Sequence, residues 1–203
     1  MGVRTGQNER PFRHGRRARS ALSPTTEGRP LKTDLFSAGI SLGSNVGDRL
    51  SNLKAARDRL FTLHQGEPET FLVSPIYETA PVGCAPGTPA FLNAVVGMES
   101  SLDPLALLDA TQTIERDLGR PDDRAKNAPR TIDVDLLYLG EAKFTNDRLE
   151  IPHPRLLLRR FVLMPLVDIL ENQVIPGLGI SATEAMTKLD SDEPVPPRFL
   201  DSW

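Results

Sequence analysis

Two carboxylates, Asp133 and Asp135, stand two residues apart in an apolar segment with the pattern of a β-strand. Strand side chains alternate between faces, so both carboxylates should project from one face and Ile132, Val134 and Leu136 from the other. Two ionised carboxylates this close raise each other's pKa unless a cation neutralises both, so a divalent metal ion or a cluster of arginines is needed beside them. All-oxygen ligation favours Mg²⁺ or Mn²⁺ as the metal.

The same pattern also fits a half-exposed strand whose aspartates simply meet water. The flanking residues favour the metal site, because Arg130 directly precedes the strand and a basic loop runs from Arg120 to Lys126. Arginines and a metal ion beside carboxylates are typical of phosphate chemistry.

The composition predicts one medium-sized domain. The chain has 203 residues, 39% of them hydrophobic, which is enough for a core. Cys84 is the single cysteine, so no internal disulfide can form. No apolar run could span a bilayer, and no secretory signal is recognisable at the N-terminus. We therefore expect a cytoplasmic protein with no membrane partner.

The positive charge is concentrated at the N-terminus. Residues 1–33 hold eight Lys or Arg against two Glu, although the whole chain has a formal charge of −3. We expect this segment to be a disordered basic extension. A flexible arm, a misassigned start codon, and a targeting or nucleic-acid tail are all compatible with it. The acidic remainder argues against nucleic-acid binding, which needs clustered Lys and Arg.

Hydrophobic periodicity predicts strands over 37–42, 71–79, 91–99 and 132–138, with helices over 48–64 and 104–118. Strand, helix, strand, strand, helix, strand is the order of an α/β, ferredoxin-like βαββαβ fold. A further short strand within 144–150 and a helix over 155–170 are expected to complete a domain of residues 34–180. Residues 181–203 are predicted to be a polar C-terminal tail.

Five separated segments carry a resemblance to a known enzyme family. They are 42–45 (LGSN), 77–83 (YETAPVG), 91–94 (FLNA), 129–135 (PRTIDVD) and 151–155 (IPHPR). In this order they resemble 6-hydroxymethyl-7,8-dihydropterin pyrophosphokinase, over about residues 37–177. The resemblance implies a monomeric enzyme of folate biosynthesis that transfers pyrophosphate from ATP to the pterin hydroxymethyl group and releases AMP.

The resemblance also implies roles for the charged residues. Asp133 and Asp135 match the family's strand aspartates, which bind two Mg²⁺ ions that bridge the ATP phosphates. Arg120 and Arg130 match catalytic loop arginines that close over ATP. One of the two carboxylates could accept the hydroxyl proton, and the sequence does not show which. Arg124 fits an ordinary solvated loop charge.

The substrate contacts follow in the same way. The residues that match ATP contacts are Gln112, Glu115, Arg148, His153 and Arg159. Those that match pterin contacts are Gly43, Thr79, Val82, Asn93 and Phe161. An amide such as that of Asn93 offers both a donor and an acceptor to the pterin edge. Phe161 would stack on the flat ring but fits a core position equally well.

The chain departs from the commoner family form in its mobile loop. Many members have Arg-Trp-Gly-Pro-Arg where residues 126–130 are Lys-Asn-Ala-Pro-Arg, and Asp122 stands where another arginine is frequent. These changes leave open a catalytically lapsed nucleotide-binding protein on the same scaffold. An RNA-binding domain of the same fold class is a third interpretation, opposed by the 5% aromatic content and the acidic core.

Overall fold

The computed structural model describes residues 34–81, 85–120 and 129–203. The predicted basic extension, Val82, and the loop residues Asp122, Arg124 and Lys126 lie outside these ranges. The elements are β1 (Phe36–Ser44), α1 (Arg49–Leu63), a 3₁₀ turn (Pro68–Thr70), β2 (Leu72–Val73), β3 (Ile76–Thr79), β4 (Phe91–Ser100), α2 (Pro104–Asp117), β5 (Asp133–Leu139), β6 (Phe144–Thr145), β7 (Glu150–Ile151), a second 3₁₀ turn (Leu156–Leu158), α3 (Arg160–Leu170), α4 (Ala182–Lys188) and β8 (Arg198–Leu200).

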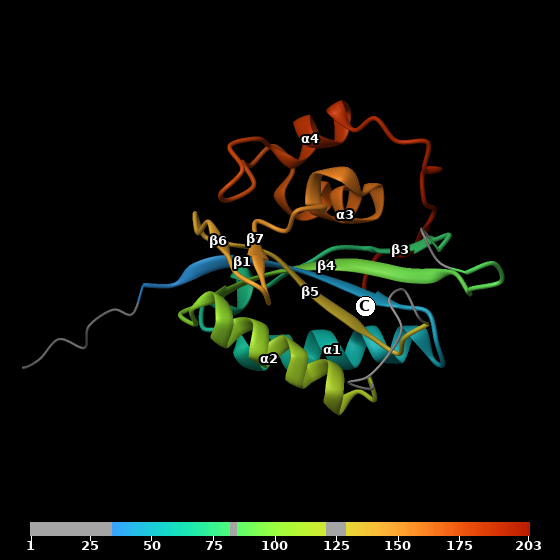
Figure 1. Ribbon diagram of the computed structural model, residues 1–203, viewed down its shortest axis with the longest axis horizontal. Helices are drawn as coiled ribbons and strands as arrows, with labels where there is room; N and C mark the ends of the chain where they lie inside the picture. The colour runs from blue at the N-terminus through green and yellow to red at the C-terminus, as the bar shows by residue number, and fades with distance from the viewer. Residues whose placement is uncertain (1–33, 82–84, 121–128) are drawn as a thin grey trace, which may run out of the picture. The chain divides into compact units, whose positions relative to one another are not determined.

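One antiparallel sheet organises the fold. Its strand order is β5-β1-β4-β3-β8, and β2 also pairs with β4. The first helix connects β1 to the β2–β3 edge and the second connects β4 to β5, which is the ferredoxin-like arrangement. The predicted fold class is confirmed. Figure 1 shows α1 and α2 on one face of the sheet and α3 and α4 on the other.

Side-chain caps begin the two long helices. The Asp48 carboxylate accepts from the Ser51 amide at 3.0 Å, and the Asp103 carboxylate accepts from two amides of the first turn of α2, with Pro104 at the first helical position. These groups satisfy amides that a helix N-terminus leaves free. Gly119, with φ +85°, takes the chain out of α2 in a conformation that favours glycine. The predicted helix limits are thus close to the observed ones.

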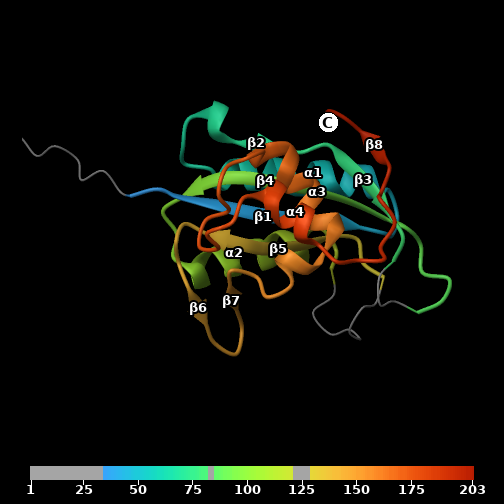
Figure 2. The same ribbon diagram turned by 90° about the horizontal axis from the view of Figure 1, so that it is seen from above.

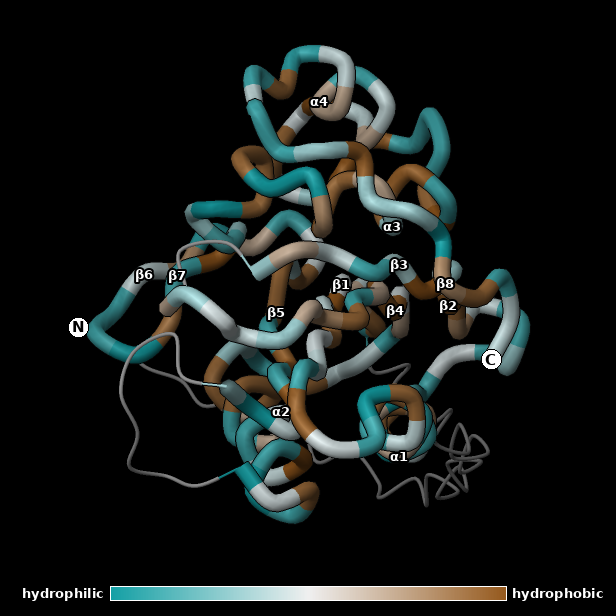
Figure 3. Tube along the Cα trace, turned by 90° about the vertical axis from the view of Figure 1, so that its right-hand side faces the viewer, coloured by the Kyte–Doolittle hydropathy of each residue, from teal (hydrophilic) through white to brown (hydrophobic). Residues whose placement is uncertain are grey.

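Each face of the sheet has its own apolar core. The larger core joins α1 and α2 to strand residues such as Ile40, Leu42 and Val134. The smaller core joins α3 and α4 to residues such as Val95 and Leu137. In Figure 3 hydrophobic colour is concentrated along the strands and α3, while the loop between β6 and β7 is hydrophilic. No helix within the described ranges is long and apolar enough to cross a membrane.

The structure differs from the sequence predictions at the C-terminal end. Residues 181–203, predicted as a tail, contain α4 and the edge strand β8, which pairs with β3 (Figure 2). The predicted strand 71–79 is two strands separated by Ser74 and Pro75, because proline cannot donate to a ladder. The region 144–150 contributes to a two-stranded hairpin, and the predicted helix 155–170 starts as a 3₁₀ turn.

Candidate active site

The two aspartates lie at one end of the α3 face of the sheet. Asp133 pairs with Gly43 of β1, and Asp135 pairs with Ser41, so both carboxylates project from the same face. The alternate residues Val134 and Leu136 are 4% and 3% exposed and belong to the core on the other face. The predicted alternation is therefore present.

Asp133 is held between the two predicted clamp arginines. Arg120 Nη1 lies 2.6 Å from Asp133 Oδ1, and Arg130 Nη1 lies 2.6 Å from Asp133 Oδ2. All three side chains are largely buried, so these ion pairs are less screened than surface pairs. The arrangement concentrates positive charge beside the strand, where it could meet a phosphate group.

Asp135 has no arginine in hydrogen-bonding contact within the described ranges. Its pKa is raised to about 7, first because the surrounding protein removes water from around the carboxylate and second because of the charge of Asp133. Water still reaches part of the side chain, since Asp135 forms part of the wall of a cleft. A cation bound beside Asp135 would stabilise the ionised carboxylate and so lower its pKa.

The glycine-containing turn after β1 positions Arg130. The Arg130 amide donates to Asn45 Oδ1 at 2.8 Å, and the Asn45 amide donates back to the Arg130 carbonyl at 3.2 Å. The next carbonyl, that of Thr131, accepts from Asn52 Nδ2 at 3.0 Å and from Ser44 Oγ at 2.5 Å. The sequence analysis did not select Asn45 or Asn52. Asn45 lies within a segment that carried the family resemblance, which was the available signal.

Glu115 connects α2 to β5. Its Oε1 accepts from the Val134 amide at 2.8 Å, and the carboxylate also pairs with Arg120. The side chain is buried and its oxygens are engaged by protein, so this geometry fits a residue that orients Arg120 as well as one that contacts nucleotide. Gln112, one turn earlier on α2, faces the same cleft.

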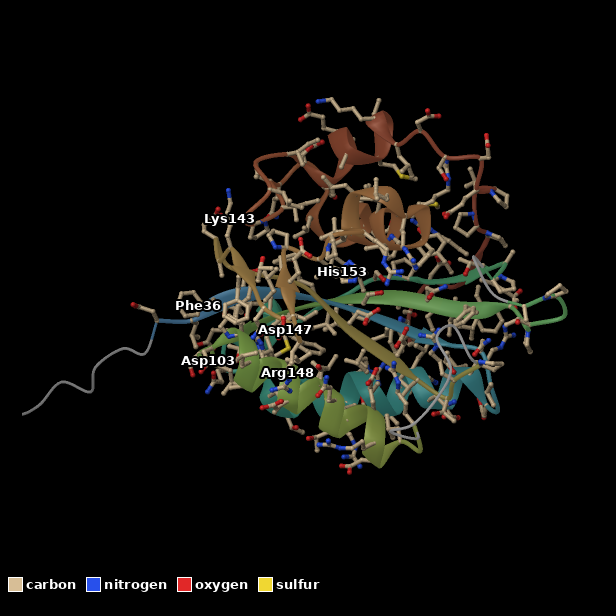
Figure 4. All side chains as sticks on the ribbon, in the orientation of Figure 1. Phe36, Asp103, Lys143, Asp147, Arg148 and His153 are labelled. Atoms are coloured by element: carbon tan, nitrogen blue, oxygen red, sulfur yellow. The ribbon has the colours of Figure 1, made fainter. Side chains whose placement is uncertain are left out.

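A cavity of about 410 Å³ lies between α2, β5 and the loop joining β6 to β7, and is called the larger cavity here. It brings together most of the predicted nucleotide and clamp residues. They are Gln112, Glu115, Arg120, Asp135, Arg148 and His153. Figure 4 labels Asp147, Arg148 and His153 near β5 and the β6–β7 hairpin. Arg148 also pairs with Asp109 of α2, which connects the loop to the helix across the opening.

His153 enters this cavity as a neutral imidazole. Burial, together with the charges of Arg155 and Arg159, lowers its pKa from 6.5 to about 4. Its Nδ1 accepts from the Arg155 amide at 3.1 Å, so Nε2 carries the proton and can donate. Arg159 does not line the larger cavity. Its own pKa is lowered by burial and by Arg155, and the Asp135 charge acts in the opposite direction.

The predicted pterin residues lie further along the same face. Asn93 pairs with Gly43 across β1 and β4, and its Nδ2 donates to Thr79 Oγ1 at 2.7 Å. A Cβ at residue 43 would lie 3.0 Å from Asn93 Oδ1 and 3.8 Å from Asp133 Cβ, so glycine keeps the space between amide and carboxylate open. Phe91, which the sequence analysis did not select, lies beneath Arg130, whose guanidinium carbon is 5.8 Å from the ring centre.

A second cavity of about 130 Å³, called the smaller cavity here, lies between β3, the start of α3 and residues 193–197. Thr79 and Phe161 both line it. Phe161 is half-buried and packs against the smaller core without belonging to its fully buried set, so the ring is partly accessible. The sequence-predicted pterin residues within the described ranges therefore occur around one stretch of the sheet.

The donor set suits a hard divalent cation that also binds substrate. No group of three or more His, Cys, Asp or Glu side chains gathers as a metal cage in residues 34–81, 85–120 and 129–203. Magnesium is commonly bound by one or two carboxylates, with substrate phosphates and water as the other ligands. Asp133 and Asp135, on one face of one strand and beside the larger cavity, fit that use.

The sequence matches the 7,8-dihydro-6-hydroxymethylpterin-pyrophosphokinase family over residues 39–171. It is 44% identical over 133 residues to the 2-amino-4-hydroxy-6-hydroxymethyldihydropteridine pyrophosphokinase of Bacillus subtilis, covering 65% of this chain and 77% of that protein. It is 41% identical over 155 residues to the mitochondrial folate synthesis bifunctional protein of Arabidopsis thaliana, covering 76% of this chain but only 26% of that protein.

Solved structures agree on the fold. A Plasmodium falciparum HPPK-DHPS crystallised with pterin and p-hydroxybenzoate superposes with a TM-score of 0.57 at 16% identity, over 80% of this chain and 42% of that one. Family match, bacterial relatives and fold lead to the same conclusion as the five sequence segments. The chain belongs to the 7,8-dihydro-6-hydroxymethylpterin pyrophosphokinase family.

Proposed function

We propose that this protein transfers pyrophosphate from ATP to the hydroxymethyl group of 6-hydroxymethyl-7,8-dihydropterin, giving AMP and the pterin diphosphate for folate biosynthesis. The main support is the position of Asp133 and its two arginines, Arg120 and Arg130. They lie between the predicted nucleotide residues around the larger cavity and the predicted pterin residues, which extend from Gly43 to the smaller cavity.

ATP would occupy the larger cavity. Gln112 and the neutral His153 offer hydrogen bonds to the base or sugar, while Arg148 and Arg120 offer charge to phosphates. Arg159 lies close enough to the two aspartates for their charges to act on it, which suits a phosphate contact. Glu115 serves mainly to orient Arg120.

The pterin would lie against Gly43, Asn93 and Thr79, with Phe161 stacked on its ring. The Asn93 amide already hydrogen-bonds Thr79, so both polar groups are oriented before substrate arrives. The hydroxymethyl group would then point along the row from Asn93 through Gly43 toward Asp133, because these three residues pair across adjacent strands. Val82 would add a backbone contact, as expected from the family.

Two Mg²⁺ ions would be held by Asp133 and Asp135 together with the ATP phosphates. When bound, they would neutralise charge on the phosphates and on the leaving AMP. The protein's own contribution is electrostatic: Arg120 and Arg130 present guanidinium groups beside the reacting phosphate. The hydroxyl oxygen bonds to the β-phosphorus, the bond to the α,β-bridging oxygen breaks, and the hydroxyl proton leaves to a carboxylate of this pair or to water.

We also propose that the protein is a cytoplasmic monomer that binds small molecules and neither nucleic acid nor membrane. Relatives from Arabidopsis thaliana and Pisum sativum are named as mitochondrial bifunctional proteins. Microscopy of a tagged chain would test the compartment, and light scattering of the purified protein would test the oligomeric state.

The deciding experiment separates AMP from ADP after incubation of the full chain with ATP, Mg²⁺ and 6-hydroxymethyl-7,8-dihydropterin. Pterin-dependent AMP is expected, and it should disappear when pterin is omitted. ADP in place of AMP would indicate an ordinary kinase. No conversion by the wild-type chain would favour the lapsed nucleotide-binding protein instead.

A further inference from the structure

The C-terminal segment Ser191–Pro197 lies across the start of α3. Residues 193–197 line the smaller cavity together with Thr79 and Phe161. The Pro197 carbonyl accepts from the Glu78 amide of β3 at 3.1 Å. A segment predicted from its sequence to be part of a polar tail thus contributes to the region where the pterin residues gather.

Several side-chain contacts anchor this segment on its C-terminal side. Arg198 Nη2 lies 2.5 Å from Asp168 of α3, and Arg198 Nε donates to the Tyr77 hydroxyl at 3.1 Å. Tyr77 in turn donates to Asp168 at 2.6 Å. Trp203 Nε1 donates to the Ser74 carbonyl at 2.8 Å. The segment that precedes these residues is therefore held at a defined place against β3 and α3.

Glu193 supplies a cap that α3 lacks from its own sequence. The N-cap residue, Arg159, makes no side-chain capping hydrogen bond. The Arg160 amide, the first of the helix, instead donates to Glu193 Oε2 at 3.3 Å, and Arg160 Nη2 donates to the Ser191 carbonyl at 3.3 Å. A carboxylate at a helix N-terminus stabilises it by hydrogen bonding and by its interaction with the helix dipole.

The capped turn carries two predicted ligand contacts. Arg159 and Phe161 are the neighbours of Arg160, and the Arg159 guanidinium carbon lies 5.1 Å from the centre of the Phe161 ring. Their side chains depend on how the first turn of α3 is placed, since a small rotation there moves both. Glu193 acts on that turn and is half-buried in the wall of the smaller cavity.

We propose that Glu193 is a positioning residue that holds the first turn of α3, and with it Phe161, in the geometry that binds pterin. The inference rests on the proposed function. It assigns to Glu193 a role in substrate binding, through a carboxylate that reaches the helix from 33 positions along the chain. The effect should fall mainly on pterin affinity, because Phe161 and residues 193–197 border the same cavity.

The test compares Glu193→Ala, Glu193→Gln and the control Asp192→Ala, an exposed carboxylate one residue away. Steady-state KM values for pterin and for ATP are measured for each full-length variant. Glu193→Ala should raise the pterin KM by about threefold to tenfold with a smaller change in the ATP KM, and Asp192→Ala should match wild type. Glu193→Gln keeps an acceptor without the charge, so it should raise the pterin KM by about twofold to threefold.

Direct binding provides a readout that does not depend on turnover. Pterin fluorescence is titrated with each variant in the presence of α,β-methylene ATP, which cannot be cleaved at the reacting bond. A wild-type pterin Kd in Glu193→Ala would overturn the inference, and so would equal losses in pterin Kd, ATP KM and kcat. If Glu193→Ala does not fold, an unchanged pterin Kd in Glu193→Gln overturns it. Wild-type chain that makes no AMP would instead refute the proposed function.

Discussion

The two ends of the candidate active site, the larger cavity and the smaller cavity, are built in different ways. The larger cavity is polar and is lined by segments between residues 108 and 154, in which α2, β5 and the β6–β7 loop follow one another. The smaller cavity joins residues 78–80, 160–161 and 193–197, which are far apart in the chain. Its position depends on β3, α3 and the C-terminal segment all being in place.

This difference predicts which substitutions should impair each end of the site. Residues of the larger cavity pair with partners 19 to 39 positions away, such as Glu115 with the Val134 amide and Arg148 with Asp109. The smaller cavity is also held by contacts of much longer range, among them Arg198 with Tyr77 across 121 positions. Loss of a single charge should therefore alter nucleotide chemistry locally, whereas pterin binding should respond to changes at some distance from the ring.

The largest effect is expected at Asp133, which stands between the two ends. Asp133→Ala removes a metal ligand and the partner of both arginines, so kcat should fall by about 10³-fold or more. Initial rates of AMP formation measure it, and Asp117→Ala, at an exposed position of α2, is the control. A loss below about tenfold in Asp133→Ala would count against a shared catalytic centre.

The separation of the two ends can be tested by measuring both the pterin KM and the ATP KM of one variant at each end. Asn93→Ala should raise the pterin KM by about tenfold, because an amide that recognises the ring edge is lost. Gln112→Ala should raise the ATP KM by about threefold and leave the pterin KM near wild type. Thermal unfolding of both variants checks that they remain folded. Equal changes in both KM values for either variant would mean that the two ends are not separate sites.

A smaller effect concerns stability without metal. The raised pKa of Asp135 means that the folded state favours the neutral carboxyl, so its ionisation destabilises the fold as pH rises from about 4 to 7. Asp135→Asn should unfold about 1–3 °C higher than wild type at pH 8 in EDTA, a modest gain because water still reaches the side chain. The gain should vanish near pH 4. Lower stability of the variant at pH 8 would contradict this.

The smallest effect is expected at His153. A pKa lowered to about 4 means that the unfolded chain binds a proton between pH 6.5 and 4 that the folded chain does not. The wild type should therefore lose stability as pH falls through this range. His153→Gln should lose less, which denaturant unfolding at pH 7, 6 and 5 would show. Parallel stability curves for the two proteins would mean that His153 is not held neutral.

Local rules predicted much of the fold and of the polar site. The helices expected over 48–64 and 104–118 are both present, and alternation along 132–136 placed both aspartates on one face. The prediction was less good where a partner distant in sequence decides the structure. Pro75 divides an apparent strand, and residues 198–200 have no strong strand pattern until β3 provides a ladder to pair with.

The sequence by itself determined the chemical type of this protein: a pair of aspartates on one strand face, arginines before it, and five ordered segments that identify the family. Only the tertiary structure decided which groups meet. Asn45 reaches Arg130 across 85 positions, and Glu193 reaches α3 across 33, contacts that no local pattern encodes. The physical reason is that strand alternation and helical periodicity depend on residues close in sequence. The Glu193 cap and the cavity walls instead form only when the sheet and α3 have packed together.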